Sequence, residues 1–209
     1  MKILAHRGHW LTPPEKNTFA AFERAWSGAY GIETDLRDLD GRVVISHDPP
    51  TKGAIDFERL LQAQAAWGPQ TPFALNVKAD GLHTLIAESI ERYRIKDYFV
   101  FDMSVPDTLH YLRAGMPVFL RLSEYEPSAP LLDRAKGIWL DAFEDDWWTV
   151  DMLRSFHAQG KIVAIVSPEL HRRPHQALWQ RVKELEPDVL SNLMLCTDFP
   201  SEADRFFAG

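Results

Sequence analysis

Short runs of β-branched and aromatic residues alternate with amphipathic helical segments along the whole sequence, and this alternation limits the folds open to the chain. In residues 17–29, for example, Phe19, Phe22 and Trp26 recur at three- and four-residue spacing and lie on one face of a helix. The predicted strands are Lys2–Ala5, Gly31–Asp35, Arg42–Ser46, Pro72–Val77, Tyr98–Phe101, Pro117–Leu120, Gly137–Leu140, Lys161–Val166 and Leu193–Cys196. The predicted helices include Asn17–Ala29, Phe57–Ala66, Leu82–Tyr93, Thr149–Gln159 and His175–Glu186.

A parallel sheet follows from this order, because parallel strands need helical crossovers between them. The strand 42–46 is the exception: Asp40-Gly41 is a tight-turn signal and predicts an antiparallel hairpin with the preceding strand. The other eight predicted strands fit an α/β fold, a (β/α)8 TIM barrel, and the 209 residues stand near its lower limit of about 200. A doubly wound open sheet is the alternative, but neither a Gly-x-Gly-x-x-Gly after the first strand nor a P-loop is present. No Pro/Gly/Ser-rich linker divides the chain, so we predict a compact single domain over residues 1–209.

Charge and cysteine content exclude several classes of protein. The 23 Lys and Arg against 30 Asp and Glu give a net charge of −7, which argues against nucleic-acid binding but permits a small phosphorylated ligand. The single cysteine, Cys196, cannot form an internal disulfide and is predicted to be a buried structural thiol. The N-terminus lacks a signal-peptide core and no stretch approaches the ~20 apolar residues of a membrane span. We therefore expect a cytoplasmic protein.

Polar residues gather where the predicted strands end, and in a parallel barrel that end carries the active site. Glu33 and Asp35 are two residues apart on one strand, so their carboxylates lie on the same face. Two neighbouring oxygen ligands suit Mg²⁺ or Ca²⁺. The alternative is an ion pair with Arg7, Lys78 or Arg37. The polar strand-end residues are His6, Arg7, Glu33, Asp35, His47, Asp48, Asn76, Lys78, Asp102, Arg121, Asp141, Ser167 and Asp198.

Two of these residues, His6 and His47, are expected at adjacent strand ends, where they could divide general-base and general-acid roles near neutral pH. Arg7 and Lys78 add fixed positive charge suited to the oxygens of a phosphate group. Each histidine, taken singly, is more typical of a hydrogen-bonded structural residue in the core or in a loop.

The ordered set of motifs resembles the glycerophosphodiester phosphodiesterase family. The resemblance is dense over residues 3–48, where His6-Arg7-Gly8, Pro14-Glu15-Lys16-Asn17-Thr18, Glu33-Thr34-Asp35 and His47-Asp48 follow one another. It returns near the C-terminus, where Thr197-Asp198-Phe199-Pro200 is similar to the family's Thr-Asp-aromatic-Pro ending. The family is built on a TIM barrel, in agreement with the strand count.

The resemblance implies the role of each site residue. His6 and His47 would be the acid–base pair, with His6 as base and His47 as acid; Glu33 and Asp35 would bind one divalent cation, and Arg7 would contact the phosphate. Lys78 matches the family's Glu-x-Lys motif on the third strand, but Asn76 replaces the glutamate. An amide oxygen can still ligate Mg²⁺ or Ca²⁺, without adding charge. Asn17 and Thr18 are expected to begin the first helix, where Asn is a favoured cap.

The expected function is therefore a phosphoric diester hydrolase of lipid metabolism that cleaves a glycerophosphodiester or a related small phosphodiester. Two loops depart from the family. The 49–76 segment is shorter than the family's usual insertion, and Ser167-Pro168-Glu169 stands within the stretch that replaces the family's Trp-Thr-Val-Asn. We expect substrate selectivity to differ accordingly. The alternative function is a barrel that binds a phosphorylated ligand without turnover. The sequence leaves the leaving group, the metal and the oligomeric state open.

Overall fold

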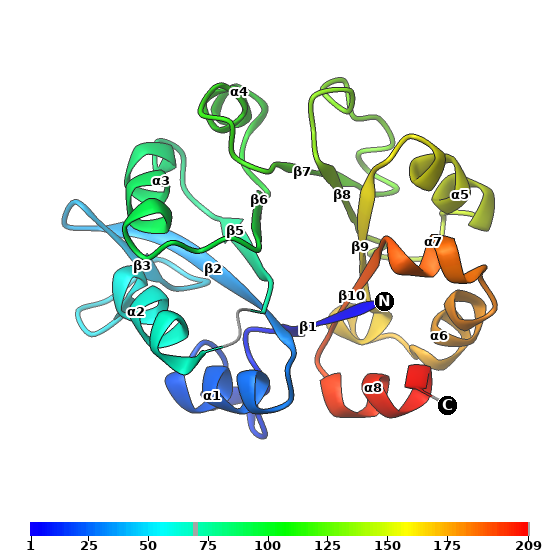
Figure 1. The fold of residues 1–209 in the computed structure, drawn as a ribbon, viewed down its shortest axis with the longest axis horizontal. Helices are drawn as coiled ribbons and strands as arrows, with labels where there is room; N and C mark the ends of the chain where they lie inside the picture. Colours follow the sequence, from blue (N-terminus) through cyan, green and yellow to red (C-terminus); the bar gives the residue numbers. More distant parts are fainter. Residues whose placement is uncertain (69–70, 209) are drawn as a thin grey trace.

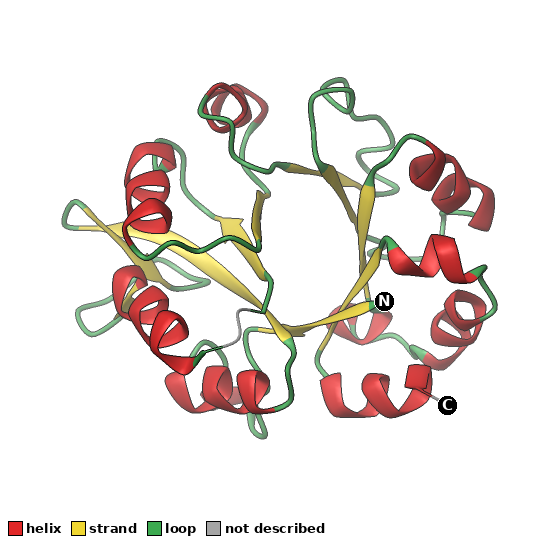
Figure 2. Ribbon diagram, in the orientation of Figure 1, coloured by secondary structure: helices red, strands yellow, loops and turns green. Residues whose placement is uncertain are grey.

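A ring of parallel strands surrounded by helices makes up the fold in this computed structural model, which describes residues 1–68 and 71–208 (Figure 1). The strands lie at the centre and the helices outside them (Figure 2). The ring contains β1 (Lys2–His6), β2 (Gly31–Leu39), β5 (Phe73–Val77), β6 (Tyr98–Phe101), β7 (Phe119–Leu122), β8 (Gly137–Leu140), β9 (Ile162–Val166) and β10 (Leu193–Thr197). The outer α-helices are α1 (Phe19–Ser27), α2 (Phe57–Trp67), α3 (His83–Arg92), α4 (Val105–Arg113), α5 (Val150–Ala158), α6 (Gln176–Lys183), α7 (Pro187–Ser191) and α8 (Pro200–Ala208).

The ring closes in two different ways. The first and last strands, β1 and β10, pair along their length, with Lys2 opposite Met194 and Ala5 opposite Thr197. On the other side, β6 and β7 meet through a single parallel bridge between Val100 and Val118, and the Val100 amide donates to the Pro117 carbonyl at 3.0 Å. The predicted TIM barrel is therefore confirmed, and the open doubly wound sheet is wrong.

The predicted hairpin after β2 is also present. Asp40 (φ 49°) and Gly41 (φ 76°) both have left-handed backbone conformations, as a type I′ turn requires. The turn places β3 (Arg42–Ile45) antiparallel to the end of β2, and a short strand that the sequence did not predict, β4 (Ile55–Asp56), extends the hairpin. The hairpin lengthens β2 beyond the barrel and carries the loop of His47.

Aromatic side chains fill the inside of the barrel. Phe99 stacks on Phe119 with ring centroids 3.8 Å apart, and Phe101 stacks on Trp139 at 4.0 Å. Small residues such as Ala74 and Ala164 face these rings from the other strands. Because this layer is apolar and closely packed, the inward-facing polar residues collect beyond it, at the carboxyl end of the strands.

The helices pack outside the barrel in two apolar clusters. One joins α1, α2 and α3 to the sheet through residues such as Phe22, Leu60 and Ile86, and the other joins α5 and α6 through Leu153 and Trp179. The segment 123–136, all of it described, has no helix between β7 and β8, although a regular β/α alternation predicts one.

Helix boundaries differ from the predictions at several points. Helix α1 begins at Phe19 rather than Asn17, because the Thr18 hydroxyl caps it by accepting a hydrogen bond from the Ala21 amide. The sequence analysis did not predict α4, α7 or α8. Within residues 1–68 and 71–208, none of the helices combines the length and apolar character needed to cross a lipid bilayer.

Candidate active site

His6 is held between two carboxylates at the mouth of the barrel. Its Nδ1 is hydrogen-bonded to Asp198 Oδ1 at 2.7 Å, and its Nε2 lies 3.9 Å from Glu33 Oε2. β1 pairs with both β10 and β2, so the three residues come from neighbouring strands or directly follow them. The imidazole is 14% exposed, which leaves one edge open to a ligand while Asp198 fixes the ring.

Arg7 turns back into the barrel mouth because its backbone is left-handed. Strand alternation would direct Arg7 outward after the inward-facing His6, but a φ of 57° reorients it, and Arg7 Nε lies 3.0 Å from Asp35 Oδ2. Gly8 (φ 85°) follows, and a Cβ at this position would lie 2.8 Å from the Ala21 Cβ. The glycine of the His-Arg-Gly motif therefore allows the close approach of α1 that supports this turn.

Asn17 has a different role from the predicted helix cap. Its amide nitrogen donates to Asp35 Oδ2 at 3.0 Å, and its carbonyl oxygen accepts from the Thr34 hydroxyl at 2.8 Å. A left-handed backbone (φ 59°) allows the side chain to reach β2. Asn17 thus orients a carboxylate of the candidate site, and Thr18 alone serves as the cap.

A second group of charges lies on the β5–β7 side of the mouth. Lys78 Nζ is 3.6 Å from Asp35 Oδ1 and 3.7 Å from Asp102 Oδ2, and Arg121 reaches Asp102 Oδ1 at 3.1 Å. Burial raises the pKa of Asp102, although Arg121, Lys78 and a hydrogen bond from Asn76 oppose the shift. Asp102 has a left-handed backbone (φ 70°), which directs its carboxylate toward these cations.

His47 lies farther from His6 than the sequence predicted. It follows β3, and β2 separates β3 from β1, so the two histidines are not at adjacent strand ends. The imidazole is 46% exposed and its Nδ1 contacts Asp48 Oδ1 at 2.9 Å. A cavity of about 380 Å³ nevertheless has His47 and Arg7 among its lining residues, together with Lys16, Asn17, Thr18, Ile45, Ser46, Asp48, Gly53, Ala54 and Ile55.

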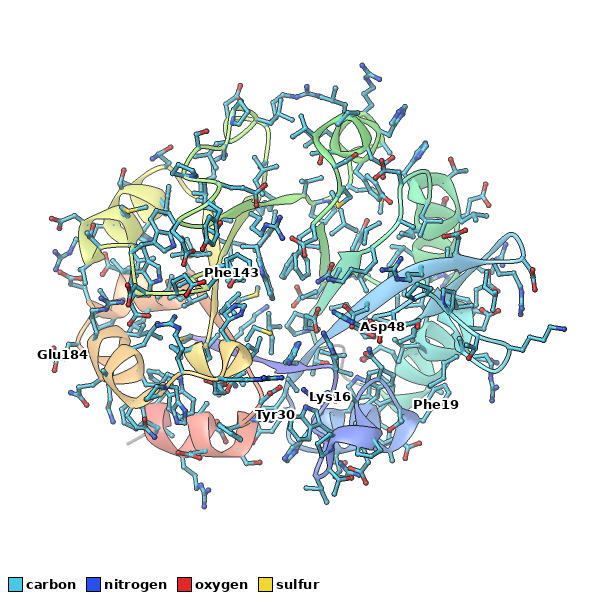
Figure 3. All side chains as sticks on the ribbon, turned by 180° about the vertical axis from the view of Figure 1, so that it is seen from behind. Lys16, Phe19, Tyr30, Asp48, Phe143 and Glu184 are labelled. Carbon is cyan, nitrogen blue, oxygen red and sulfur yellow. The ribbon has the colours of Figure 1, made fainter. Side chains whose placement is uncertain are left out.

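The cavity also has a cation that the sequence analysis did not assign, Lys16. Its ammonium group lies 4.4 Å from the centre of the Trp10 ring and 3.7 Å from Asp198 Oδ2. Figure 3 places Lys16 and Asp48 on one side of the ring of strands and Phe143, from the loop after β8, on the other. The strand-end position of Asp198 was visible in the sequence, but its partners His6 and Lys16 were not.

Glu33, Asp35 and Asn76 supply the candidate oxygen ligands of a divalent cation. Asp35 and Asn76 are directly paired on β2 and β5, and Asp35 Oδ1 and Asn76 Oδ1 are both buried with no hydrogen-bond donor among the described residues. Burial and the neighbouring charge of Asp35 raise the pKa of Glu33 to about 7. The three side chains offer only oxygen ligands. Asp35 Oδ1 and Asn76 Oδ1 lack hydrogen-bond donors within the described part of the chain, and the charged form of Glu33 is destabilised by burial, so the set fits a hard cation such as Mg²⁺ or Ca²⁺.

The carboxylates also have the ion pairs that were weighed as the alternative to metal binding. Asp35 is paired with Arg7 and Lys78, whereas Arg37 donates to the His47 carbonyl instead. Among the described residues, no three His, Cys, Asp or Glu side chains form a group that could hold a metal ion, so the cation would depend on the Asn76 amide as its third ligand.

The fold was compared with known proteins. No model of a known protein family matches the sequence. Among solved structures, a candidate glycerophosphodiester phosphodiesterase from Galdieria sulphuraria aligns with a TM-score of 0.78 and 18% identity, over 100% of this chain and 98% of that one. The glycerophosphodiester phosphodiesterase from Agrobacterium tumefaciens str. C58 aligns with a TM-score of 0.70 and 16% identity, over 100% and 99%. This chain has the fold of the glycerophosphodiester phosphodiesterases.

A third solved structure extends the comparison to phospholipases. A Ca²⁺-dependent phosphatidylinositol-specific phospholipase C from Streptomyces antibioticus aligns with a TM-score of 0.58 and 12% identity, over 99% of this chain and 95% of that one. One barrel fold can host unrelated reactions, so at these identities the chemistry must be argued from the site.

Proposed function

We propose that the protein is a metal-dependent phosphodiesterase that hydrolyses a glycerophosphodiester or a related small phosphodiester. The observation that carries the proposal is the position of His6, fixed by Asp198 at 2.7 Å beside Glu33 and within one mouth that also holds Arg7 and Lys78. An oriented imidazole, fixed cations and unsatisfied oxygens together suit the transfer of protons around a phosphate group.

Arg7 and Lys78 bind the phosphate oxygens and stabilise the negative charge that grows on them in the transition state. Glu33, Asp35 and Asn76 would hold one Mg²⁺ or Ca²⁺ ion. Such an ion, when bound, polarises a phosphoryl oxygen. Because Asp35 already has two cationic partners, binding of the phosphate draws Arg7 and Lys78 away from the carboxylate and exposes its oxygens.

Proton transfer is assigned to the two histidines. His6 takes a proton from the attacking group, which is water or a neighbouring hydroxyl of the substrate, and His47 gives a proton to the leaving alkoxide. The bond from phosphorus to the leaving oxygen breaks as the new phosphorus–oxygen bond forms, and an alcohol is released. Attack by a neighbouring hydroxyl yields a cyclic phosphate first, which water then opens.

A second function, phosphate-ligand binding without turnover, is favoured by one observation. Arg7 and Lys78 already pair with Asp35, so its charge is compensated without a cation. We further propose a cytoplasmic location, with a small phosphodiester as the ligand under the first function and a phosphorylated compound under the second.

The experiment that separates them is release of alcohol from a panel of glycerophosphodiesters, measured with Mg²⁺, with Ca²⁺ and with EDTA. The proposal expects turnover that needs a divalent cation and is lost in the His6→Asn variant, whereas His157→Asn, a change at a partly exposed helix residue, leaves it unchanged. Binding of the diesters with no alcohol released under any of these conditions would overturn the proposal and support the second function.

A further inference from the structure

A buried glutamate on the loop after β9 accepts hydrogen bonds from the residues at the end of β10. Glu169 belongs to the 3-10 turn Pro168–His171, and its side chain is 8% exposed. Its Oε1 accepts hydrogen bonds from the Thr197 hydroxyl and from the Asp198 amide, the latter at 3.1 Å. Its Oε2 accepts from the Ser167 hydroxyl. One carboxylate oxygen therefore holds the segment that carries Asp198, and the other is held by Ser167 of the loop to which Glu169 belongs.

The hydrogen bonds continue from this glutamate to the outer helices. The Trp179 indole of α6 donates to the Ser167 hydroxyl at 2.8 Å, and Trp179 itself is 1% exposed. The His175 ring lies 4.1 Å from the Trp179 ring, with its Nδ1 3.8 Å from Glu169 Oε2 and its Nε2 3.5 Å from Glu202 Oε1. Helix α6 and its N-cap residue His175 therefore contact both the glutamate and the loop that carries it.

The surroundings of Glu169 favour a carboxylate over an amide. Three donors, two hydroxyls and one backbone amide, converge on two oxygens. A glutamine has one acceptor oxygen, so its NH₂ group would bond the Ser167 hydroxyl only if that hydroxyl, which already accepts from Trp179, gave up its present donor role. Burying a carboxylate costs free energy that a simple loop contact does not need. A role in holding Asp198 explains why the carboxylate is buried here, because Asp198 is the hydrogen-bond partner of His6 Nδ1.

We propose that Glu169 is a positioning residue for His6 and acts through Asp198. It holds the Asp198 amide and the Thr197 hydroxyl, which aims the Asp198 carboxylate at the imidazole and so keeps one ring orientation and one tautomer. This inference rests on the proposed function for its effect on rate, but the hydrogen-bond relay that it describes exists independently of that function.

The test compares Glu169→Gln with a matched control, Glu202→Gln, which makes the same change on the other side of His175, at a carboxylate that is 53% exposed. We expect Glu169→Gln to lower kcat about 10- to 100-fold with KM little changed, the usual size of a loss of outer support, and Glu202→Gln to leave both within about twofold. In the double variant with Asp198→Asn, Glu169→Gln should cost little more, because both changes break the same relay.

A second readout does not depend on turnover. The ring signals of His6, assigned in NMR spectra by their loss in His6→Asn, should shift in Glu169→Gln and not in Glu202→Gln. If parent turnover depends on His6 but Glu169→Gln changes neither kcat nor the His6 signals, the proposal is overturned. If the parent has no turnover and the signals still shift, the positioning role stands and the proposed function fails. Should Glu169→Gln not fold, Thr197→Val removes one donor of the relay, and an unchanged kcat and His6 signal there would equally overturn the proposal.

Discussion

Asp198 Oδ1 and His6 Nδ1 are hydrogen-bonded at 2.7 Å although 192 residues separate them in the chain. Parallel pairing of β10 with β1, in which Ala5 lies opposite Thr197, brings the two residues together. The first and last strands of the barrel thus bring together one hydrogen-bonded histidine–carboxylate pair. His6 Nε2 then faces Glu33, at the position where the candidate cation site begins.

Asp198→Asn should lower kcat by about 10²-fold or more, the scale of general acid–base catalysis. The amide keeps the size of the side chain but can donate as well as accept, so the imidazole no longer has one fixed tautomer. Steady-state kinetics on the best diester of the panel measure the loss. Asp188→Asn, at a carboxylate that is 73% exposed beside His157, is the control, and parental kcat in Asp198→Asn would contradict the assigned role.

Asp198 should also contribute to stability in a pH-dependent way. Burial by itself raises the pKa of this carboxyl, but the hydrogen bond and charge of His6, together with Lys16, outweigh burial and hold the pKa below the usual 3.8. A lowered carboxyl pKa stabilises the fold above the unfolded value and loses this effect as pH falls through the folded value. The free energy of unfolding of the parent should exceed that of Asp198→Asn at about pH 5, and the difference should shrink toward about pH 2. Urea denaturation across this range measures it, and a constant difference would refute the linkage.

Asn17→Gly and Asn17→Ala should both destabilise the fold, and alanine should do so more. Either change removes the hydrogen bonds of Asn17 with Asp35 and Thr34, and leaving the buried Thr34 hydroxyl without an acceptor costs about 1–3 kcal/mol. Alanine adds about 1 kcal/mol, because the φ of 59° is left-handed and glycine alone adopts it freely. Denaturant unfolding of the two variants gives both contributions. Equal stabilities would mean that the backbone relaxes out of the left-handed region.

Mg²⁺ or Ca²⁺ should raise the Tm of the parent, and the rise should be larger in Asn76→Asp. The change is nearly isosteric and adds a third negative charge beside Asp35, so attraction to a divalent ion increases, while the ion-free variant loses stability through charge repulsion. Thermal unfolding with EDTA and with each ion tests this. Asn192→Asp, at a residue bonded to His157, is the control for added charge. Identical ion-induced shifts in the parent and Asn76→Asp would place Asn76 outside the metal site.

His47→Asn should cost about 10²-fold or more in kcat with little effect on stability. Its side chain is 46% exposed and is bonded to Asp48, which is 87% exposed, so the fold depends little on this contact. Kinetics and denaturant unfolding on the same preparation give the two quantities. A folded variant with parental turnover would leave His47 without a catalytic role and direct attention to another donor at the mouth.

The sequence predicts the barrel well because its evidence is periodic and local. Strand order, the Asp40-Gly41 hairpin and the inward pair Glu33 and Asp35 all follow from alternation with period two and from crossover rules. Helix α4 was missed because its buried residues are Asp107, Thr108 and Tyr111, so polar residues interrupt the apolar stripe.

The details of the site could not be predicted, because they depend on backbone reversals that alternation does not contain. Arg7, Asn17 and Asp102 all have positive φ, and each side chain therefore turns toward the mouth from a position where a regular strand or helix cap would direct it elsewhere. The contact of Asp198 with His6, and that of Glu169 with Asp198, join distant parts of the chain and appear only once the ring is closed.

β6 and β7 are joined by a single bridge, and the helices before and after this point pack into two separate apolar clusters. The buried residues of one outer apolar cluster come from residues 5–118 and those of the other from residues 122–203, so a cut in the Gly115–Pro117 loop would give two fragments that keep nearly all of their own outer core, with Val118 moving to the second. His6, Glu33 and Lys78 belong to the first fragment, and Asp198 with its support from Glu169 belongs to the second. The proposed phosphodiesterase activity would then report reassembly of the fragments, since neither half alone contains His6 together with Asp198.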